Sequence, residues 1–493
     1  MKRRTFLKSG LAALALAGAG TGSLSLLGKN GLVTSAEAGG FSDPLPIPPL
    51  LTNLDVSGET ASFTMDVQQG KMNFFPGTHT ATLGYNGNFL GPTIRVRNGQ
   101  QFRINVHNRL PEVTTLHWHG LHVPAQWDGG PRQPIPAGTT WSPDFTINQE
   151  AATLWYHPHA MGLTGEQVYY GLAGLFLIED DISDNLDIPK TYGVDDIPLV
   201  IQDRRFFENG QFAYAQNMHD VMNGVIGNHL LVNGVMQPTL TIPGGQVRLR
   251  LLNGSNSSIY KIAFDDQRTF HVIASDGGFL EHPAPMNSII LSAGERAEII
   301  VDFSKESQYA VISLLVEQMR GSSFEAMRIA VNGTTGVTPM VQDLRTIEKI
   351  PESEATKVRE FIMETMSMGR GRMGMGMMGR RLTINGKKMD INRIDELVQL
   401  GSTEIWEVTN RSAMMMSMPH SMHLHDVQFQ ILSRNGRTPP AHEQGRKDTV
   451  LIMPGETVRI ISRFRDYTGV YMYHCHLLEH EDDGMMGQFE VIS

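Results

Sequence analysis

The chain has 493 residues and a formal net charge of −10 at pH 7, with 50 glycines, 25 prolines and a single cysteine. It is too long for one hydrophobic core, and its length points to about three domains. The acidic balance argues against a nucleic-acid partner, and the lone cysteine excludes an internal disulfide. The many glycines and prolines indicate frequent turns, so we expect an all-β architecture.

The N-terminal segment is typical of an exported protein. Arg3 and Arg4 precede a modestly apolar stretch at residues 11–27, and the small-x-small sequence of residues 36–38 follows. This order is that of a twin-arginine signal peptide, which we place at residues 1–38 and expect to be cleaved. An uncleaved anchor helix is the alternative. No apolar run after residue 27 is long enough to span a bilayer, so we predict a periplasmic protein without stable membrane insertion.

Three parts of the chain resemble one another. Each has an Asn-Gly turn, a short strand, a turn and a second alternating strand that ends in asparagine, at residues 85–110, 232–255 and 384–412. A second shared turn and strand follows in each part, at residues 137–147, 293–303 and 454–464. Short period-two strands between Gly, Pro and Asn turns predict β-sandwiches, and the long repeat predicts whole domains. We expect these domains at residues 39–180, 181–335 and 336–493.

The chain has 18 histidines, and ten of them fall in four tight clusters. These are His117 and His119; His157 and His159; His420, His423 and His425; and His474, His476 and His480. Residues two apart in an extended strand point to the same face, while the residue between them points to the other. His474 and His476 would therefore face one site and Cys475 another.

The residues near Cys475 suggest two kinds of metal site. A cysteine and two histidines with a weak axial thioether describe a blue-copper electron-transfer centre. Cys475 and His480 would supply two of these ligands, with Met485 ten residues after the cysteine and His420 as the unpaired member of its cluster. The remaining paired histidines come without a carboxylate, which favours several coppers over a catalytic zinc. We expect this second site between the first and third domains.

Four motifs in this order and spacing, HWHG, HPHA, HSMHLH and HCHLLEHEDDGMM, resemble those of the multicopper oxidases. The resemblance covers nearly the whole mature chain and implies three consecutive cupredoxin-type Greek-key domains. It also implies about four coppers per chain. By this resemblance, type 1 copper is bound by His420, Cys475, His480 and Met485; type 2 copper by His117 and His423; and the type 3 pair by His119, His157, His159, His425, His474 and His476.

The family's reaction couples four one-electron oxidations of a donor at the type 1 copper to reduction of O2 to water at the trinuclear cluster. Reduction to water consumes protons, and a buried cluster needs carboxylates to relay them. Asp128 and Glu481 match positions that serve this purpose in similar enzymes. His122 lies near the first motif but out of its register, so we expect at most a supporting contact there.

The electron donor is suggested by the methionines, 28 in all. They gather at residues 363–381, within a Met-rich loop expected at 363–389, and at residues 413–423. Thioethers select Cu(I), although methionine clusters also fill cores. The composition resembles that of periplasmic copper-efflux oxidases, which oxidise Cu(I), and implies that Met416 and Met418 contact the substrate. Those enzymes carry an aspartate at the position of Met416, and the arginines of this loop should repel a cation.

Two alternatives remain at this point. The first is a laccase-type oxidase of small phenols or of other metal ions. The second is a non-catalytic copper-binding periplasmic protein, which is disfavoured because every ligand position of the motifs is kept. We expect a monomer whose partners are O2 and either Cu(I) or a small phenolic donor.

Overall fold

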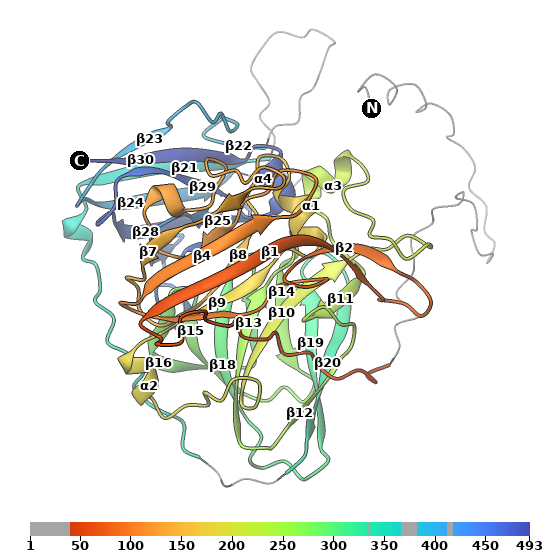
Figure 1. The fold of residues 1–493 in the computed structure, drawn as a ribbon. Helices are drawn as coiled ribbons and strands as arrows, with labels where there is room; N and C mark the ends of the chain where they lie inside the picture. Colours follow the sequence, from red (N-terminus) through yellow and green to blue (C-terminus); the bar gives the residue numbers. More distant parts are fainter. Residues whose placement is uncertain (1–39, 334–335, 337, 366–381, 412–417) are drawn as a thin grey trace, which may run out of the picture.

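The computed structural model describes residues 40–333, 336, 338–365, 382–411 and 418–493. The expected signal peptide, Met416 and residues 366–381 of the Met-rich loop lie outside the described residues. Within the described part of the chain, no helix is long and apolar enough to cross a membrane. The described sheets pair into three β-sandwiches along the chain, so the all-β prediction is confirmed (Figure 1).

The first sandwich has sheets with the strand orders β2-β1-β4-β6 and β3-β9-β8-β5, with β7 paired to β4. Every second residue of β4 is buried, as expected for a strand that covers a core on one face. Its elements are β1 (Thr60–Met72), β2 (Thr80–Tyr85), β3 (Ile94–Arg97), β4 (Gln101–Asn108), β5 (His117–His119), η1 (Ala125–Trp127), β6 (Thr140–Trp141), β7 (Asp144–Thr146), β8 (Ala152–His157), α1 (Thr164–Tyr169) and β9 (Gly174–Glu179).

The second sandwich has the strand orders β11-β10-β13-β18-β15-β16 and β12-β20-β19-β14-β17. Among the described residues, it has the largest hydrophobic core of the three. Its elements are α2 (Asp181–Asn185), β10 (Asp196–Arg204), α3 (Met218–Asn223), β11 (His229–Val232), β12 (Thr239–Ile242), β13 (Gln246–Asn253), β14 (Tyr260–Phe264), β15 (Phe270–Ser275), β16 (Gly278–Met286), β17 (Ser288–Leu291), β18 (Arg296–Asp302), β19 (Val311–Gln318) and β20 (Ser323–Val331).

The third sandwich has the strand orders β22-β21-β24-β28-β26 and β23-β30-β29-β25-β27. Its elements are η2 (Glu352–Glu354), β21 (Lys357–Glu364), β22 (Thr383–Ile384), β23 (Glu396–Gln399), β24 (Thr403–Asn410), β25 (His420–Leu424), β26 (Gln430–Arg434), η3 (Ala441–Glu443), β27 (Thr449–Ile452), β28 (Thr457–Arg463), β29 (Gly469–Cys475), α4 (Leu478–Asp482) and β30 (Met486–Ile492).

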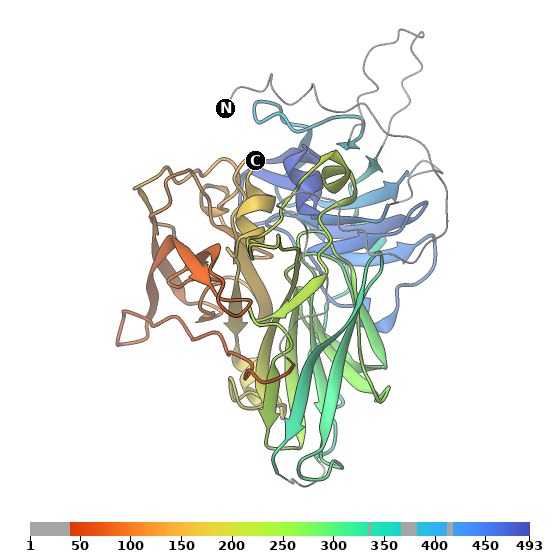
Figure 2. The ribbon, with the colours of Figure 1, turned by 90° about the vertical axis from the view of Figure 1, so that its right-hand side faces the viewer.

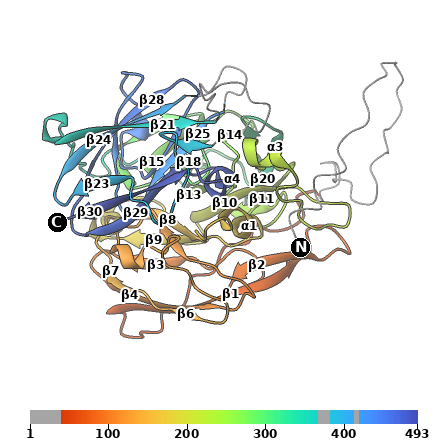
Figure 3. The same ribbon diagram turned by 90° about the horizontal axis from the view of Figure 1, so that it is seen from above.

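The same topology recurs in the three sandwiches, as the internal repeats predicted. The first strand of each pairs in parallel with a later strand: β1 with β4, β10 with β13, and β21 with β24. In Figure 2 the first sandwich lies on the left, the third at the upper right and the second below them. Viewed from above, α1, α3 and α4 meet where the sandwiches join (Figure 3). The domain boundaries themselves remain a prediction.

One expectation was too wide. The Met-rich loop was placed at residues 363–389, but β21 runs to Glu364 and pairs with β22. Met363 is fully buried in the core of the third sandwich. The alternation of apolar and polar residues in β21 continues through Met363, so its side chain belongs to the strand and not to the loop.

Candidate metal centres

The single cysteine lies in a small buried site of the third sandwich. Sγ of Cys475, the last residue of β29, lies 3.5 Å from Nδ1 of His420 and 3.6 Å from Nδ1 of His480. All three side chains are fully buried, as is that of Met485, whose backbone carbonyl accepts the Cys475 N–H at 3.0 Å. One sulfur and two imidazole nitrogens this close together can hold one soft metal ion. We call this group the cysteine site.

Burial decides the charge of the cysteine site. It raises the pKa of the Cys475 thiol to about 12 and lowers the pKa of His480 to about 4. Near neutral pH the site therefore carries a thiol and neutral rings, and a thiolate forms only when a cation displaces the thiol proton.

The imidazoles of His420 and His480 also make hydrogen-bond contacts on the ring edge that faces away from Cys475. Nε2 of His420 lies 3.1 Å from Oγ1 of Thr365, and Nε2 of His480 lies 3.2 Å from the carbonyl oxygen of Met222 in α3. His480 donates its Nε2–H to this carbonyl, and His420 donates to the Thr365 hydroxyl in the tautomer that turns the lone pair of Nδ1 toward Cys475. This tautomer is the one that a metal at Nδ1 requires.

Eight further histidines from the first and third sandwiches line a second buried site, which we call the histidine site. None is more than 1% exposed. Burial lowers the pKa of most of these rings far below its ordinary value, which keeps them neutral. The members are His117, His119, His157, His159, His423, His425, His474 and His476.

Ring nitrogens face one another across the histidine site. Nε2 of His474 lies 3.2 Å from Nε2 of both His159 and His425. Nδ1 of His119 lies 3.3 Å from Nε2 of His157. A neutral ring has one N–H, and several of these rings already point it outward. Lone pairs converging in a buried space need a cation to satisfy them.

Backbone oxygens set the direction of several of these rings. Nδ1 of His117 donates to the carbonyl of Asp128 at 2.9 Å, and Nδ1 of His423 to the carbonyl of Asp448 at 2.9 Å. Nε2 of His117 and of His423 is buried with no hydrogen-bond partner among the described residues. The donor set therefore fits metal ions that prefer imidazole, with copper and zinc among them.

The predicted carboxylates Asp128 and Glu481 both lie beside the histidine site. Oδ2 of Asp128 is 2.8 Å from Nδ1 of His425. The two oxygens of Glu481 face Nδ1 of His159 at 3.2 Å and Nδ1 of His474 at 3.1 Å. Burial raises the pKa of Asp128 well above its ordinary value. Burial acts in the same sense on Glu481, but the imidazoles of His159 and His474 outweigh it and lower its pKa.

The end of β29 joins the two sites. His474 and His476 belong to the histidine site, with ring centroids 5.6 Å apart, while Cys475 between them faces the cysteine site. The sequence predicted this alternation. Among the described strands, β5 alone contains both members of a histidine pair. β8 ends at His157, where Pro158 has no N–H to continue the ladder.

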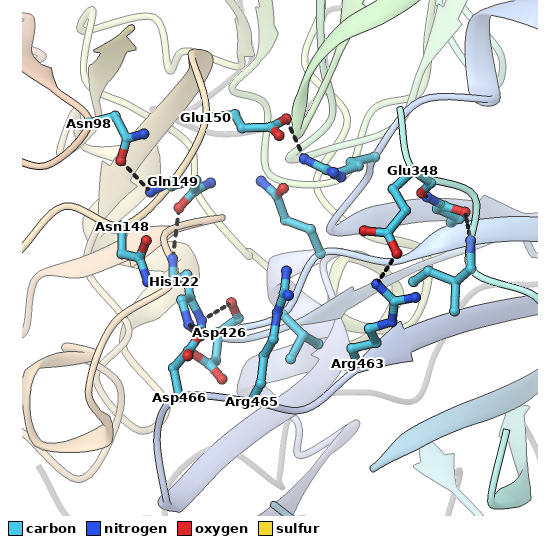
Figure 4. A pocket seen from close by; sticks show the side chains of 15 residues that line it. Asn98, His122, Asn148, Gln149, Glu150, Glu348, Asp426, Arg463, Arg465 and Asp466 are labelled. Carbon is cyan, nitrogen blue, oxygen red and sulfur yellow. Dashed lines mark hydrogen bonds and ion pairs between the residues drawn. The ribbon is translucent and has the colours of Figure 1, made fainter. Parts of the chain in front are cut away.

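A polar cleft of about 380 Å³ opens between the first and third sandwiches (Figure 4). On its wall, Nδ1 of His122 lies 2.8 Å from Asp426, and Nε2 lies 3.0 Å from Asp466. Asp426, which lines the cleft, directly follows His425 of the histidine site in the sequence. Among the described residues, His122 belongs to none of the groups that could hold a metal ion.

Sequence reasoning missed several supporting residues. Thr365 and Met222 contact the cysteine site, and Asp448 and Thr449 contact the histidine site. No motif marks them, because each reaches its histidine from a different strand or sandwich.

Comparison with known proteins agrees with this geometry. Family models described as multicopper oxidase match residues 66–183, 202–331 and 362–493. The multicopper oxidase mco of Staphylococcus aureus is 38% identical over 430 residues, which cover 87% of this chain and 88% of that protein. The chain belongs to the multicopper oxidase family. The resemblance drawn from the four motifs, the three cupredoxin-type domains and the assignment as an oxidoreductase are confirmed.

Relatives of this multicopper oxidase carry different names. A laccase-like multicopper oxidase CueO from Ochrobactrum, described as having oxidase activity towards lignin model compounds and lignosulfonate, superposes with a TM-score of 0.82 at 39% identity, covering 91% of this chain and all of that one. The cell division protein FtsP of Escherichia coli is 37% identical over 92% of this chain and 94% of its own. The family implies copper, O2 and a reducing substrate, and leaves the substrate open.

Proposed function

We propose that this chain is a cuprous oxidase that takes electrons from Cu(I) at a type 1 copper and uses four of them to reduce O2 to water at a trinuclear copper cluster. The observation that carries the proposal is the junction at β29, where adjacent residues enter two buried donor sets of different chemistry. Only a few covalent bonds separate Cys475 from the imidazoles of His474 and His476.

The cysteine site is the proposed type 1 centre, with Met485 as a weak axial ligand. In the histidine site, the proposed type 2 ligands are His117 and His423. The proposed type 3 ligands are His119, His157, His159, His425, His474 and His476. We propose about four coppers per chain, because imidazole and thiolate donors of this kind suit copper.

Copper bound in these sites would supply the one-electron redox chemistry. The protein's part is to orient the rings and to hold protons near them. Asp128, at Nδ1 of His425, and Glu481, between His159 and His474, are the carboxylates placed to pass protons toward the histidine site. Their environments move their pKa values in opposite directions, which suits two carboxylates with different tasks.

The proposal of Cu(I) as donor rests on the methionines. Met418 lies two residues before His420, is 3% exposed and packs in the core of the third sandwich. A copper ion held by its thioether would lie below the surface and close to the cysteine site. We propose Met416, which lies outside the described residues, as the second substrate methionine.

Small phenols are the second candidate donor. The observation that favours them is the likeness to the laccase-like enzyme of Ochrobactrum, which extends over nearly the whole chain. The similarity to the cell division protein FtsP favours a third candidate, a non-catalytic function. We propose that the protein is a periplasmic monomer. Residues 1–38 are the proposed signal peptide for its export by the twin-arginine pathway.

Oxygen uptake by the copper-loaded protein with Cu(I) and with a small phenol tests this function. We expect the wild-type protein to be blue and to turn over Cu(I) faster than the phenol. Cys475→Ser should remove both the colour and the oxidase activity, because a hydroxyl is a poor ligand for this centre. A colourless variant that still consumes O2 at the wild-type rate would refute the proposal.

A further inference from the structure

A buried carboxylate, Asp448, lies between the second sandwich and the histidine site. It directly precedes β27 and is fully buried. Its two oxygens accept a forked pair of hydrogen bonds from Arg296, the first residue of β18, at 2.7 and 2.6 Å. Arg296 is 1% exposed. The second sandwich supplies none of the proposed copper ligands. The guanidinium group of its Arg296 nevertheless contacts Asp448, beside the histidine site.

The preceding residue strengthens this attachment. Nζ of Lys447 lies 2.7 Å from Asp276 and 3.1 Å from Glu295, both in the second sandwich. Lys447 thus pairs with two carboxylates of the second sandwich, and Asp448 pairs with its arginine. These ion pairs fix the position of Asp448 relative to the second sandwich.

The opposite side of Asp448 faces the proposed copper ligands. Oδ1 lies 3.0 Å from Nε2 of His119, and its backbone carbonyl accepts from Nδ1 of His423. The rings of His119 and His423 stack with centroids 3.7 Å apart and planes 10° from parallel. One residue thus contacts a histidine of the first sandwich and a histidine of the third.

The neighbour Thr449 completes this contact. Its Oγ1 lies 3.0 Å from Nε2 of His119 and donates to Oδ1 of Asp448 at 2.8 Å. Since that hydroxyl proton is used toward the carboxylate, Nε2 of His119 meets two acceptor oxygens. A neutral imidazole in this position carries its proton on Nε2.

This arrangement sets His119 apart from its neighbours. His117, His157 and His423 donate through Nδ1 to backbone carbonyls and leave Nε2 for the cavity. His119 is reversed, with Nε2 outward and Nδ1 facing His157 at 3.3 Å. Its local backbone does not account for the difference, because His117 and His119 share the same short strand.

The chain leaves room for this contact at Gly120. A Cβ atom there would lie 2.4 Å from Oδ2 of Asp448 and 2.7 Å from the guanidinium of Arg296, and φ is +86°. Only glycine allows the backbone to pass this close to the ion pair.

We propose that Asp448, fixed by Arg296, is a positioning residue that holds His119 in the tautomer presenting Nδ1 to copper and sets the orientation of His423. The inference rests on the proposed ligand roles of these two histidines. A carboxylate that accepts the outer N–H of a ligating imidazole fixes the ring and makes it more basic. The second sandwich thereby shapes a copper cluster to which it gives no ligand.

Asp448→Asn tests this with little change in shape. Either orientation of the new amide sets an NH2 group against a donor, the guanidinium of Arg296 or Nε2–H of His119. The matched control is Asp196→Asn. Asp196 is fully buried and accepts a forked pair from Arg250 at 2.7 and 2.8 Å, and no ligand histidine is among its contacts in the described part of the chain.

The readouts are copper content by elemental analysis, the electron paramagnetic resonance spectrum and the blue absorption of the cysteine site. We expect Asp448→Asn to keep the blue colour and to lose about 10–100-fold in affinity for cluster copper. Asp196→Asn should keep full copper while losing similar thermal stability. Wild-type copper content and spectrum in Asp448→Asn, with only a lower Tm, would overturn the proposal.

A second pair of variants covers the case in which Asp448→Asn does not fold. Thr449→Val removes the hydroxyl beside His119 and His423. Thr153→Val removes a hydroxyl whose partners among the described residues are Arg250 and Glu298. Loss of cluster copper in the first variant alone supports the proposal, and equal copper content in both overturns it. A wild-type protein that binds copper only at the cysteine site would instead refute the proposed function.

Discussion

The hydroxyl of Thr365 lies 3.1 Å from Nε2 of His420, on the edge of the ring opposite the Nδ1 atom that faces Cys475. Thr365 is 1% exposed and ends the described stretch before the Met-rich segment. The other imidazole of the cysteine site is closed in the same way by the carbonyl of Met222. Both imidazoles of the cysteine site are therefore held on the ring edge that faces away from Cys475.

Thr365→Val should raise the redox potential of the cysteine site by a few tens of mV. The hydrogen bond from His420 to Thr365 makes the ring a better donor to a metal at Nδ1 and so stabilises Cu(II). A net hydrogen bond contributes about 1 kcal/mol. Redox titration of the blue absorption measures the shift. Thr383→Val is the control, because the buried hydroxyl of Thr383 has no partner among the described residues; equal potentials in both variants would count against the role of Thr365.

Asp128→Asn and Glu481→Gln should slow turnover by about 100-fold while leaving the colour intact. A positioned proton donor contributes about that factor or more, and neither side chain touches Cys475. Rapid-mixing measurements separate the two stages: bleaching of the blue band by a donor should stay fast, and its return with O2 should be slow. Slow bleaching would place the defect at the cysteine site and contradict the relay.

Deleting residues 366–381 should lower kcat/KM for Cu(I) and leave a bulky phenol unchanged or improved. The deletion begins after Thr365 because Met363 is part of the core, where its loss would cost about 2–5 kcal/mol of stability. The Tm serves as the control. Equal losses for both donors together with a lower Tm would mean that these methionines act in packing and not in capture of Cu(I).

The fold and the candidate ligand positions could be predicted from the motifs, because both depend on short-range sequence patterns. Alternation along a strand places His474 and His476 on one side and Cys475 on the other whatever lies beyond. Asp448 could not be predicted in this way. Its contacts with Arg296 and His119 depend on how three sandwiches pack, and its neighbours in the sequence, Lys447 and Thr449, are those of an ordinary strand start.

The same limit applied to His122, which the sequence placed only near the first motif. It contacts Asp426 and Asp466 of the third sandwich on the wall of the polar cleft. Burial opposes its charged form, but the carboxylates of Asp426 and Asp466 outweigh this and raise the pKa of His122 above its ordinary value. In its protonated form, the ring makes ion pairs that tie the first sandwich to the third.

This bridge should make stability depend on pH in a defined direction. Because the folded-state pKa is raised, the stabilisation by His122 is fully present below its unfolded value of about 6.5 and is lost as the pH rises through the folded value. We expect His122→Gln to have a lower Tm than the wild type at pH 6 and a similar Tm at pH 9.

His229→Gln provides a control of opposite sign. Burial lowers the pKa of His229, so its contribution is present above the unfolded value and is lost as the pH falls. Thermal melts of the copper-loaded wild type and both variants at pH 5 to 9 measure the two slopes, with copper content checked at each pH. If the difference in Tm between the wild type and His122→Gln stayed constant or widened toward pH 9, the contacts of His122 would not be ionic. His122 would then stabilise the fold by packing alone.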